Sequence, residues 1–169
     1  VSIYLIPLSG VKNRIDNSWV NIQSYVESQD VKDAARKTSF GSRLEMWKTA
    51  WLIFLENPVV GVGWGNYIID ADELVKKGIV GKDVAKYSHP HNQFMSALSK
   101  GGGLGFISIV VLYLLPMLIF YKVLSGDTKP MNDRLALAGF LLLVAFLCFS
   151  LTEAILERSR SIIFFSFYL

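Results

Sequence analysis

The only two histidines among the 169 residues, His89 and His91, stand on either side of a proline. Histidine is the side chain best able to take up a proton near neutral pH, because its unperturbed pKa is about 6.5. Two histidines at this spacing can also chelate zinc. A zinc site needs at least a third ligand, however, and no cysteine, histidine or carboxylate stands at a matching spacing. We therefore predict no metal, and a catalytic and a structural role both stay open.

The residues after the histidines predict the start of a helix. Pro90 suits the first helical position, and an apolar face follows that ends at Lys100-Gly101. The members of this face are Phe94, Ala97 and Leu98. His91 would project from the first turn, where free backbone amides and the helix dipole favour anions. His89 would belong to the loop that leads to the helix.

Two uncharged stretches lie at residues 101–121 and 135–152. At a rise of 1.5 Å per residue, each can cross a hydrocarbon core of about 30 Å as a helix. The composition agrees, because 52% of the residues are apolar and the mean hydropathy is +0.39, more than in ordinary soluble domains. We predict an all-α, polytopic membrane protein. The net charge of +3 is too small and dispersed to indicate nucleic acid as a partner.

Charge placement predicts the orientation of these helices. Short loops rich in Lys and Arg tend to stay in the cytoplasm, and the loop after the first span carries Lys122, Lys129 and Arg134. The long polar segment and Glu153–Arg160 would then face the exterior. We expect part of a longer protein, divided into the end of a membrane span (1–9), an exterior domain (10–101) and further spans (102–169; about 102–122, 135–152 and a truncated one from 161 onward).

The exterior domain is predicted to contain an amphipathic helix over residues 41–58. Ser42 and Glu45 fit a capping box. Arg43 would lie at the helix N-terminus, and Asn57-Pro58 would end the helix. The helix either packs on the rest of the protein or lies in the membrane interface, where tryptophan is favoured.

Two short segments follow this helix. Glycines at positions 61, 63 and 65 do not fit the spacing of a dinucleotide-binding loop and predict a tight turn. Residues 70–86 mix charges without periodicity and predict a mobile, irregular exterior loop.

The order of these motifs resembles the O-antigen ligase superfamily of bacterial envelope glycosyltransferases. This superfamily includes O-antigen ligases, Wzy-type polymerases and some protein O-oligosaccharyltransferases. The resemblance begins with Arg43 and Trp47 and continues through NPVVGVGWGNY. Its most specific element is HPHNQFMSALSKGGGLGF, a His-Asn pair followed by an apolar helix and a glycine turn, and LTEAILERSR closes it at Arg160. Many members carry an acid before the glycine, where this chain has Ser99-Lys100.

The resemblance implies GT-C-like membrane helices and a large, mostly helical periplasmic loop that carries the active site. It also implies a place in the bacterial inner membrane. The implied reaction transfers a glycan from undecaprenyl pyrophosphate to a hydroxyl acceptor, which for a ligase is a sugar of lipid A-core. This transfer uses no metal and no cofactor. By match to the motif, His91 is the catalytic residue and Arg43 binds the pyrophosphate.

The chemistry of the residues agrees with these implied roles. Transfer from a sugar pyrophosphate needs a base for the incoming hydroxyl and cations for the leaving group. Arginine suits phosphate because its planar fork donates two hydrogen bonds and stays charged. Topology adds Arg160 as a second phosphate ligand and Glu153 as an orienting partner, although both equally suit anchors at the membrane surface. Asn92 and His89 are supporting candidates.

Three functions remain open at this point. The first is an O-antigen ligase, with a lipid-linked glycan donor, a lipid A-core acceptor and membrane lipid as partners. The second is a Wzy-type polymerase or a protein O-oligosaccharyltransferase, which differs in the acceptor. The third is a non-catalytic glycolipid transporter. The predicted spans carry no Asp, Glu, His, Lys or Arg between 101 and 121 or between 135 and 152, which disfavours transport.

Overall fold

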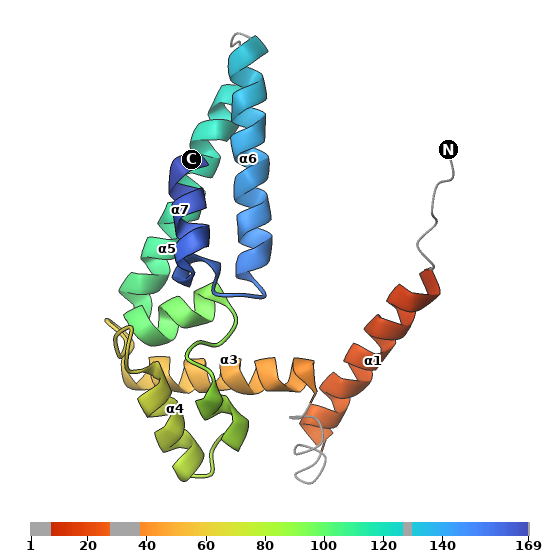
Figure 1. Cartoon of the computed structure of the whole chain (residues 1–169), viewed down its shortest axis with the longest axis vertical. Coiled ribbons are helices and arrows are strands. Elements are labelled where there is room, and N and C mark those ends of the chain that lie inside the picture. The colour runs from red at the N-terminus through yellow and green to blue at the C-terminus, as the bar shows by residue number, and fades with distance from the viewer. Residues whose placement is uncertain (1–7, 28–37, 127–129, 169) are drawn as a thin grey trace. The chain divides into compact units, whose positions relative to one another are not determined.

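The structure is a computed structural model and describes residues 8–27, 38–126 and 130–168. Every regular element in these ranges is a helix, which confirms the predicted all-α class (Figure 1). The chain divides into two compact units, residues 1–45 and 46–169. The functional interest lies in the second unit, because it contains both histidines.

The first unit contains α1 (Leu8–Glu27) and the beginning of α3 (Ser39–Glu56). The predicted end of a membrane span at residues 1–9 lies outside the described residues, except for its last two, which belong to α1. The predicted capping box at Ser42 is wrong, because α3 begins three residues earlier. Thr38 caps this start: its Oγ1 accepts a hydrogen bond from the Gly41 amide at 3.0 Å.

The rest of α3 packs against α4 (Tyr67–Lys76) and the short helix η1 (Lys82–Lys86). Their buried residues form one core, which comprises Met46, Ala50, Ile53, Tyr67, Ala71, Leu74, Val80 and Val84. The predicted irregular loop over 70–86 is therefore wrong. A helix of ten residues is marginal by itself, and burial of Tyr67 and Leu74 against α3 stabilises it. The helix α3 ends before Asn57-Pro58, as predicted.

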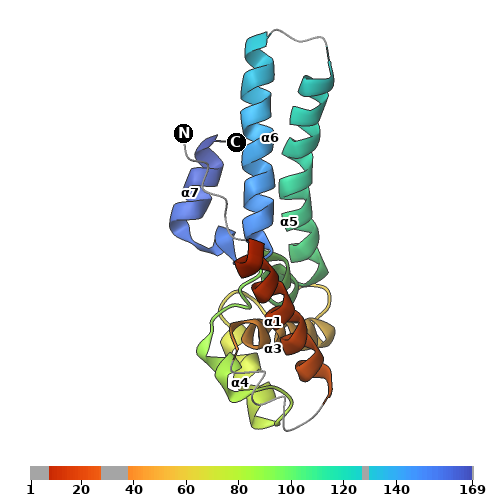
Figure 2. The ribbon, with the colours of Figure 1, turned by 90° about the vertical axis from the view of Figure 1, so that its right-hand side faces the viewer.

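Two long helices, α5 (Gln93–Ser125) and α6 (Pro130–Ser150), are long and apolar enough to cross a membrane. The helix α5 includes the first predicted span, α6 includes the second as far as Ser150, and the two helices lie side by side (Figures 1 and 2). Between them Tyr113 Oη and Ser150 Oγ form a buried hydrogen bond of 2.7 Å. Gly139 faces the Phe120 ring so closely that a Cβ atom would lie 2.5 Å from it. Such small-residue contacts are typical of helices that pack within membranes.

The last elements are the short helix η2 (Ile155–Glu157) and α7 (Ser159–Tyr168). Phe165 of α7 packs its ring against Tyr113 and Phe146, with ring centroids 5.7 and 5.0 Å apart. Leu156, in the segment between α6 and α7, belongs to the same apolar cluster, against which Phe94 at the beginning of α5 also packs. These contacts hold the segment next to the beginning of α5.

The helix α5 is broken at Gly102. The sequence predicts that a helix ends at Lys100-Gly101 and a span follows; the structure instead joins the two helices across a kink, where Gly102 has φ 63° and ψ −157°. Only glycine adopts this conformation readily. Gly61 lies against the same point, because a Cβ atom there would be 2.4 Å from the Lys100 carbonyl carbon. The backbones at Gly61 and Gly102 approach so closely that neither position has room for a Cβ atom.

The turn at residues 58–63 satisfies the backbone groups that the kink leaves free. Four hydrogen bonds of 2.8 to 3.2 Å join it to α5: Val62 N to Ser99 O, Gly63 N to Lys100 O, Gly103 N to Pro58 O, and Leu104 N to Val59 O. The first two close the C-terminal end of one helical part, and the others close the N-terminal end of the next. The predicted tight turn is confirmed. Its hydrogen bonds hold the two parts of the broken helix together.

Candidate functional site

Glu153 lies between the two histidines, in the segment that connects α6 to η2. Its Oε1 lies 3.0 Å from His89 Nε2 and 3.1 Å from His91 Nδ1, and its Oε2 lies 3.2 Å from His91 Nδ1. The two imidazole rings are 4.7 Å apart between centroids. The three side chains are only 21, 26 and 29% exposed in the order His89, His91, Glu153. They form a partly buried polar cluster, the His-Glu cluster.

His91 owes its position to an unusual backbone. It has a φ of 47°, the only positive φ among the described residues other than glycine, and Asn92 follows as the N-cap of α5. The Asn92 Oδ1 accepts from the amides of Phe94 and Met95 at 2.9 and 3.0 Å. Its Nδ2 donates to the Leu151 carbonyl at 2.9 Å. Asn92 thus ties α5 to the Glu153 segment.

The predicted helix start at Pro90 is therefore wrong by three residues. His91 precedes the helix rather than projecting from its first turn, because the Asn92 side chain is the better cap for the free amides. Pro90 is buried, and its carbonyl accepts a hydrogen bond of 3.0 Å from Trp47 Nε1 on α3. Trp47 thereby holds the His-Pro-His segment from one side while Asn92 holds it from the other.

The charges around Glu153 keep it ionised. Arg158 Nη2 donates to Oε2 at 3.0 Å, and the Ala154 amide donates to Oε1 at 3.2 Å. Burial raises the pKa of Glu153, but hydrogen bonds from His89 and His91 outweigh burial and lower it below its usual value. An ionised carboxylate only accepts hydrogen bonds, so both histidines donate to it. His91 must then carry its proton on Nδ1.

This tautomer leaves the other nitrogen of His91 with a lone pair. Among the described residues, His91 Nε2 has no hydrogen-bond partner. His89 has the opposite arrangement, since its Nε2 donates to Glu153 and its Nδ1 lies 3.2 Å from Ser88 Oγ. The cluster therefore presents one proton-accepting atom, on His91, that is supported from behind by a carboxylate.

The sequence places the two histidines apart, His89 in a loop and His91 in a helix, whereas the structure brings them together. Both contact the same carboxylate, so they form a pair. It also supplies the third potential metal ligand that the spacing lacked: one atom each of His89, His91 and Glu153 lies within 4.8 Å of the others. Glu153 is 62 residues away from His91 along the chain, and only the fold brings it there.

A second polar network lies behind the first and was not predicted. Lys100 Nζ binds Glu157 Oε2 at 2.7 Å, with the two side chains 3 and 15% exposed. The Ser96 hydroxyl also donates to Glu157, and Gln93 Oε1 accepts from the Leu156 amide at 2.9 Å. The Lys100 ammonium group faces the Trp64 and Tyr67 rings at 5.6 and 5.9 Å from their centroids. This network fastens η2 to α5.

The predicted phosphate ligands lie on separate elements. Arg43 is half-buried in the second turn of α3, in the first unit, and Arg160 is exposed in the first turn of α7. Their roles stay predictions. The arginine that the structure joins to the cluster is Arg158, which the sequence placed on the same face without a role of its own.

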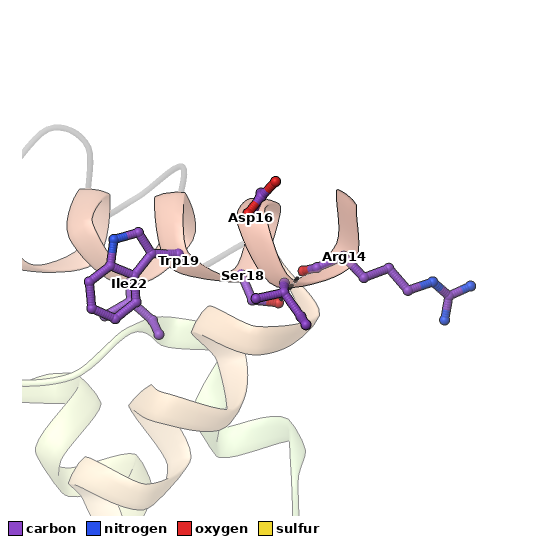
Figure 3. Close-up of a pocket in the computed structure, with 6 residues that line it drawn as sticks. Arg14, Asp16, Ser18, Trp19 and Ile22 are labelled. Carbon is purple, nitrogen blue, oxygen red and sulfur yellow. Dashed lines mark hydrogen bonds between the residues drawn. The ribbon is translucent and has the colours of Figure 1, made fainter. Parts of the chain in front are cut away.

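A shallow hollow on the first unit contains none of these residues (Figure 3). All of its lining side chains come from α1: Arg14, Ile15, Asp16, Ser18, Trp19 and Ile22. Its one polar contact is local, from Ser18 Oγ to the Arg14 carbonyl at 2.7 Å. This face of a single helix holds one carboxylate, Asp16, and no histidine, whereas the His-Glu cluster combines two imidazoles with a carboxylate, so the cluster is the better candidate site.

Comparison with known proteins shows the family to which this chain belongs. A protein of Haemophilus influenzae strain Rd, described as uncharacterized, is 27% identical over 164 residues. The match covers 94% of this chain and 38% of that protein, so this chain spans less than half the length of the relative. The sequence model of the family described as O-antigen ligase matches residues 2–110, which include Arg43, both histidines and the kink. The chain belongs to the O-antigen ligase family.

Proposed function

We propose that this chain carries the active site of an O-antigen ligase of the bacterial inner membrane. The enzyme transfers a glycan from undecaprenyl pyrophosphate to a sugar hydroxyl of lipid A-core. One observation carries the proposal: His91 Nδ1 is bonded to an ionised Glu153, and Nε2 is left free to accept a proton. Family membership supports a glycosyltransferase of the O-antigen pathway, and the two apolar helices support a membrane protein.

The reaction needs one proton transfer and one displacement. His91 Nε2 takes the proton of the acceptor hydroxyl as its oxygen attacks the anomeric carbon of the donor glycan. The new carbon–oxygen bond forms while the bond from that carbon to the pyrophosphate oxygen breaks. The electron pair leaves with the undecaprenyl pyrophosphate. Glu153 stabilises the imidazolium that forms on His91, as a carboxylate behind a catalytic histidine does in serine hydrolases.

The leaving pyrophosphate needs positive charge. Arg43 and Arg160 are the proposed ligands, since a guanidinium group stays charged and donates a pair of parallel hydrogen bonds. Arg158 is engaged with Glu153 and acts on the base rather than on the phosphate. The active site faces the periplasm in this proposal, because the loop between α5 and α6 carries the cationic residues that favour the cytoplasm.

Replacement of His91 tests the proposal. In a strain that lacks the gene of the full-length protein, His91→Ala should reduce polymer-bearing lipopolysaccharide by about 10²- to 10⁴-fold, the usual contribution of a general base. Lys82→Ala, an exposed residue of η1, is the matched control and should restore it. Equal membrane levels of both variants must be shown by immunoblot. Normal lipopolysaccharide with His91→Ala would refute the proposal.

The deletion strain separates a ligase from a polymerase. Without a ligase, long polymer stays on undecaprenyl pyrophosphate; without a polymerase, single repeats reach the core. Analysis of the lipid-linked and core-linked glycans of the same culture therefore decides between the two acceptors. Single repeats on the core would show that the protein is a polymerase rather than a ligase. The proposed role of His91 as the base would stay the same.

A further inference from the structure

We propose that His89, His91 and Glu153 form a zinc site, and that zinc bound there inhibits the transferase. The inhibition rests on the proposed function, whereas the binding does not. The proposal gives His89 a role that the transfer mechanism leaves without one, since only His91 needs to contact the acceptor.

The distances between the ligand atoms fit the ion. Zinc binds histidine nitrogen at about 2.0–2.1 Å and carboxylate oxygen at about 2.0–2.2 Å in a tetrahedron, which separates neighbouring ligand atoms by about 3.3 Å. In the cluster, Glu153 Oε1 lies 3.0 Å from His89 Nε2 and 3.1 Å from His91 Nδ1. The three ligand atoms all lie within 4.8 Å of one another. Side-chain shifts of a few tenths of an ångström to about one ångström complete the geometry.

The surroundings hold the ligands in place. Arg158 Nη2 binds Glu153 Oε2 and leaves Oε1 for the ion. Ser88 Oγ lies 3.2 Å from His89 Nδ1 and can accept a hydrogen bond from the Nδ1–H group once zinc occupies the other nitrogen. Outer contacts of this kind orient zinc ligands and increase affinity by about 10- to 100-fold. The ligands are partly exposed, so the ion can enter, and its fourth position stays open.

Zinc at this site changes the tautomer of His91. A neutral imidazole carries one proton, and without metal Nδ1 donates that proton in its hydrogen bond to the Glu153 carboxylate. Zinc takes the lone pair of Nδ1, so the proton must reside on Nε2. Nε2 is the atom that has to accept the proton of the acceptor hydroxyl. The bound ion thus converts the base into a group that cannot act as one.

Binding is measured first, on the purified full-length protein with zinc chloride alone. A dialysis titration should find one site that weakens by about 10- to 100-fold or more in His89→Ala and in Glu153→Gln. His89→Gln is a second variant that retains polarity if His89→Ala is unstable. Lys82→Ala and Cys148→Ser are the controls and should bind as the parent does. Equal zinc binding in parent and His89 variants would overturn the site.

Transfer is measured next, with lipid-linked donor and lipid A-core acceptor. Zinc at saturating concentration should stop transfer in the parent, and EDTA should restore it in full. If zinc binds at the cluster but leaves the rate unchanged or increases it, the inhibition is wrong. If EDTA alone abolishes transfer and zinc restores it, zinc is a cofactor and the inhibition is likewise overturned. Undiminished transfer by His91→Ala would refute the proposed function without affecting the binding result.

Discussion

The buried pair of Lys100 and Glu157 permits a quantitative prediction. Lys100→Met removes the ammonium group from a site where it is 3% exposed and leaves the Glu157 carboxylate, 15% exposed, without its cation. Removal of one partner of a buried ion pair costs about 3–5 kcal/mol. The Ser96 hydroxyl still donates to Glu157, so we expect the lower end, about 3 kcal/mol of the free energy of unfolding.

The double variant distinguishes charge from packing. Lys100→Met with Glu157→Gln removes both charges, and a matched replacement of a buried pair is often close to neutral. We therefore expect the double variant to be more stable than Lys100→Met alone, with a coupling energy of about 2 kcal/mol in the double-mutant cycle, within the range for residues in contact.

Reversible unfolding of the full-length protein in mixed detergent micelles measures these free energies. The cycle needs the parent, both single variants and the double variant under one condition. Two results would refute the reasoning: additive effects within about 0.5 kcal/mol, or a loss below about 1 kcal/mol for Lys100→Met. Either result would mean that the Lys100–Glu157 ion pair is effectively hydrated despite its low exposure.

Further predictions concern the His-Glu cluster and its supports. Glu153→Gln should reduce the transfer rate by about 10- to 100-fold, since a hydrogen bond to a charged group contributes about 1.5–3 kcal/mol; an unchanged rate in a donor–acceptor assay would contradict the role of the carboxylate. Because the pKa of Glu153 is lowered in the folded protein, its stabilising effect is present at neutral pH and is lost as the pH falls through that lowered value. The difference in thermal midpoint between parent and Glu153→Gln should accordingly shrink on acidification, and a constant difference would argue against it. Trp47→Phe retains the ring but loses the hydrogen bond to Pro90, so the free energy of unfolding should fall by about 1 kcal/mol; no loss in the same unfolding assay would show that the bond is dispensable. Gly61→Ala should greatly reduce the yield of monodisperse protein, because its Cβ would lie 2.4 Å from backbone, whereas Gly65→Ala, with open space around it, should not.

The sequence predicted the elements whose signals are local. The end of α3 follows from Asn57-Pro58, and the apolar runs within α5 and α6 are continuous in the chain. The helix α4 was missed because its apolar residues span fewer than three turns and become meaningful only against α3. A glycine run is compatible with a helix end and with a kink, so the sequence alone does not reveal that α5 continues beyond Gly102.

The site shows the same division. The type and motif of His91 predict it as a site residue, and topology predicts Glu153; both roles stay predictions. The contact of both histidines with one carboxylate depends on a positive φ at His91 and on the Asn92 contact with Leu151, which no spacing displays. Glu157 was overlooked because a carboxylate near arginines reads as a surface group, whereas the fold buries it against Lys100.

In the proposed enzyme, the break in α5 also determines how far His91 lies from the membrane-spanning part of the helix. If α5 were straight, the ten residues from Asn92 to Gly101 would lift His91 by about 15 Å from the start of the apolar run. The first part of the helix instead turns across the axis of the remainder (Figure 1). In the proposed enzyme this keeps His91 near the headgroup layer, where the pyrophosphate of a lipid donor resides. The donor can then react while its hydrocarbon tail stays in the bilayer.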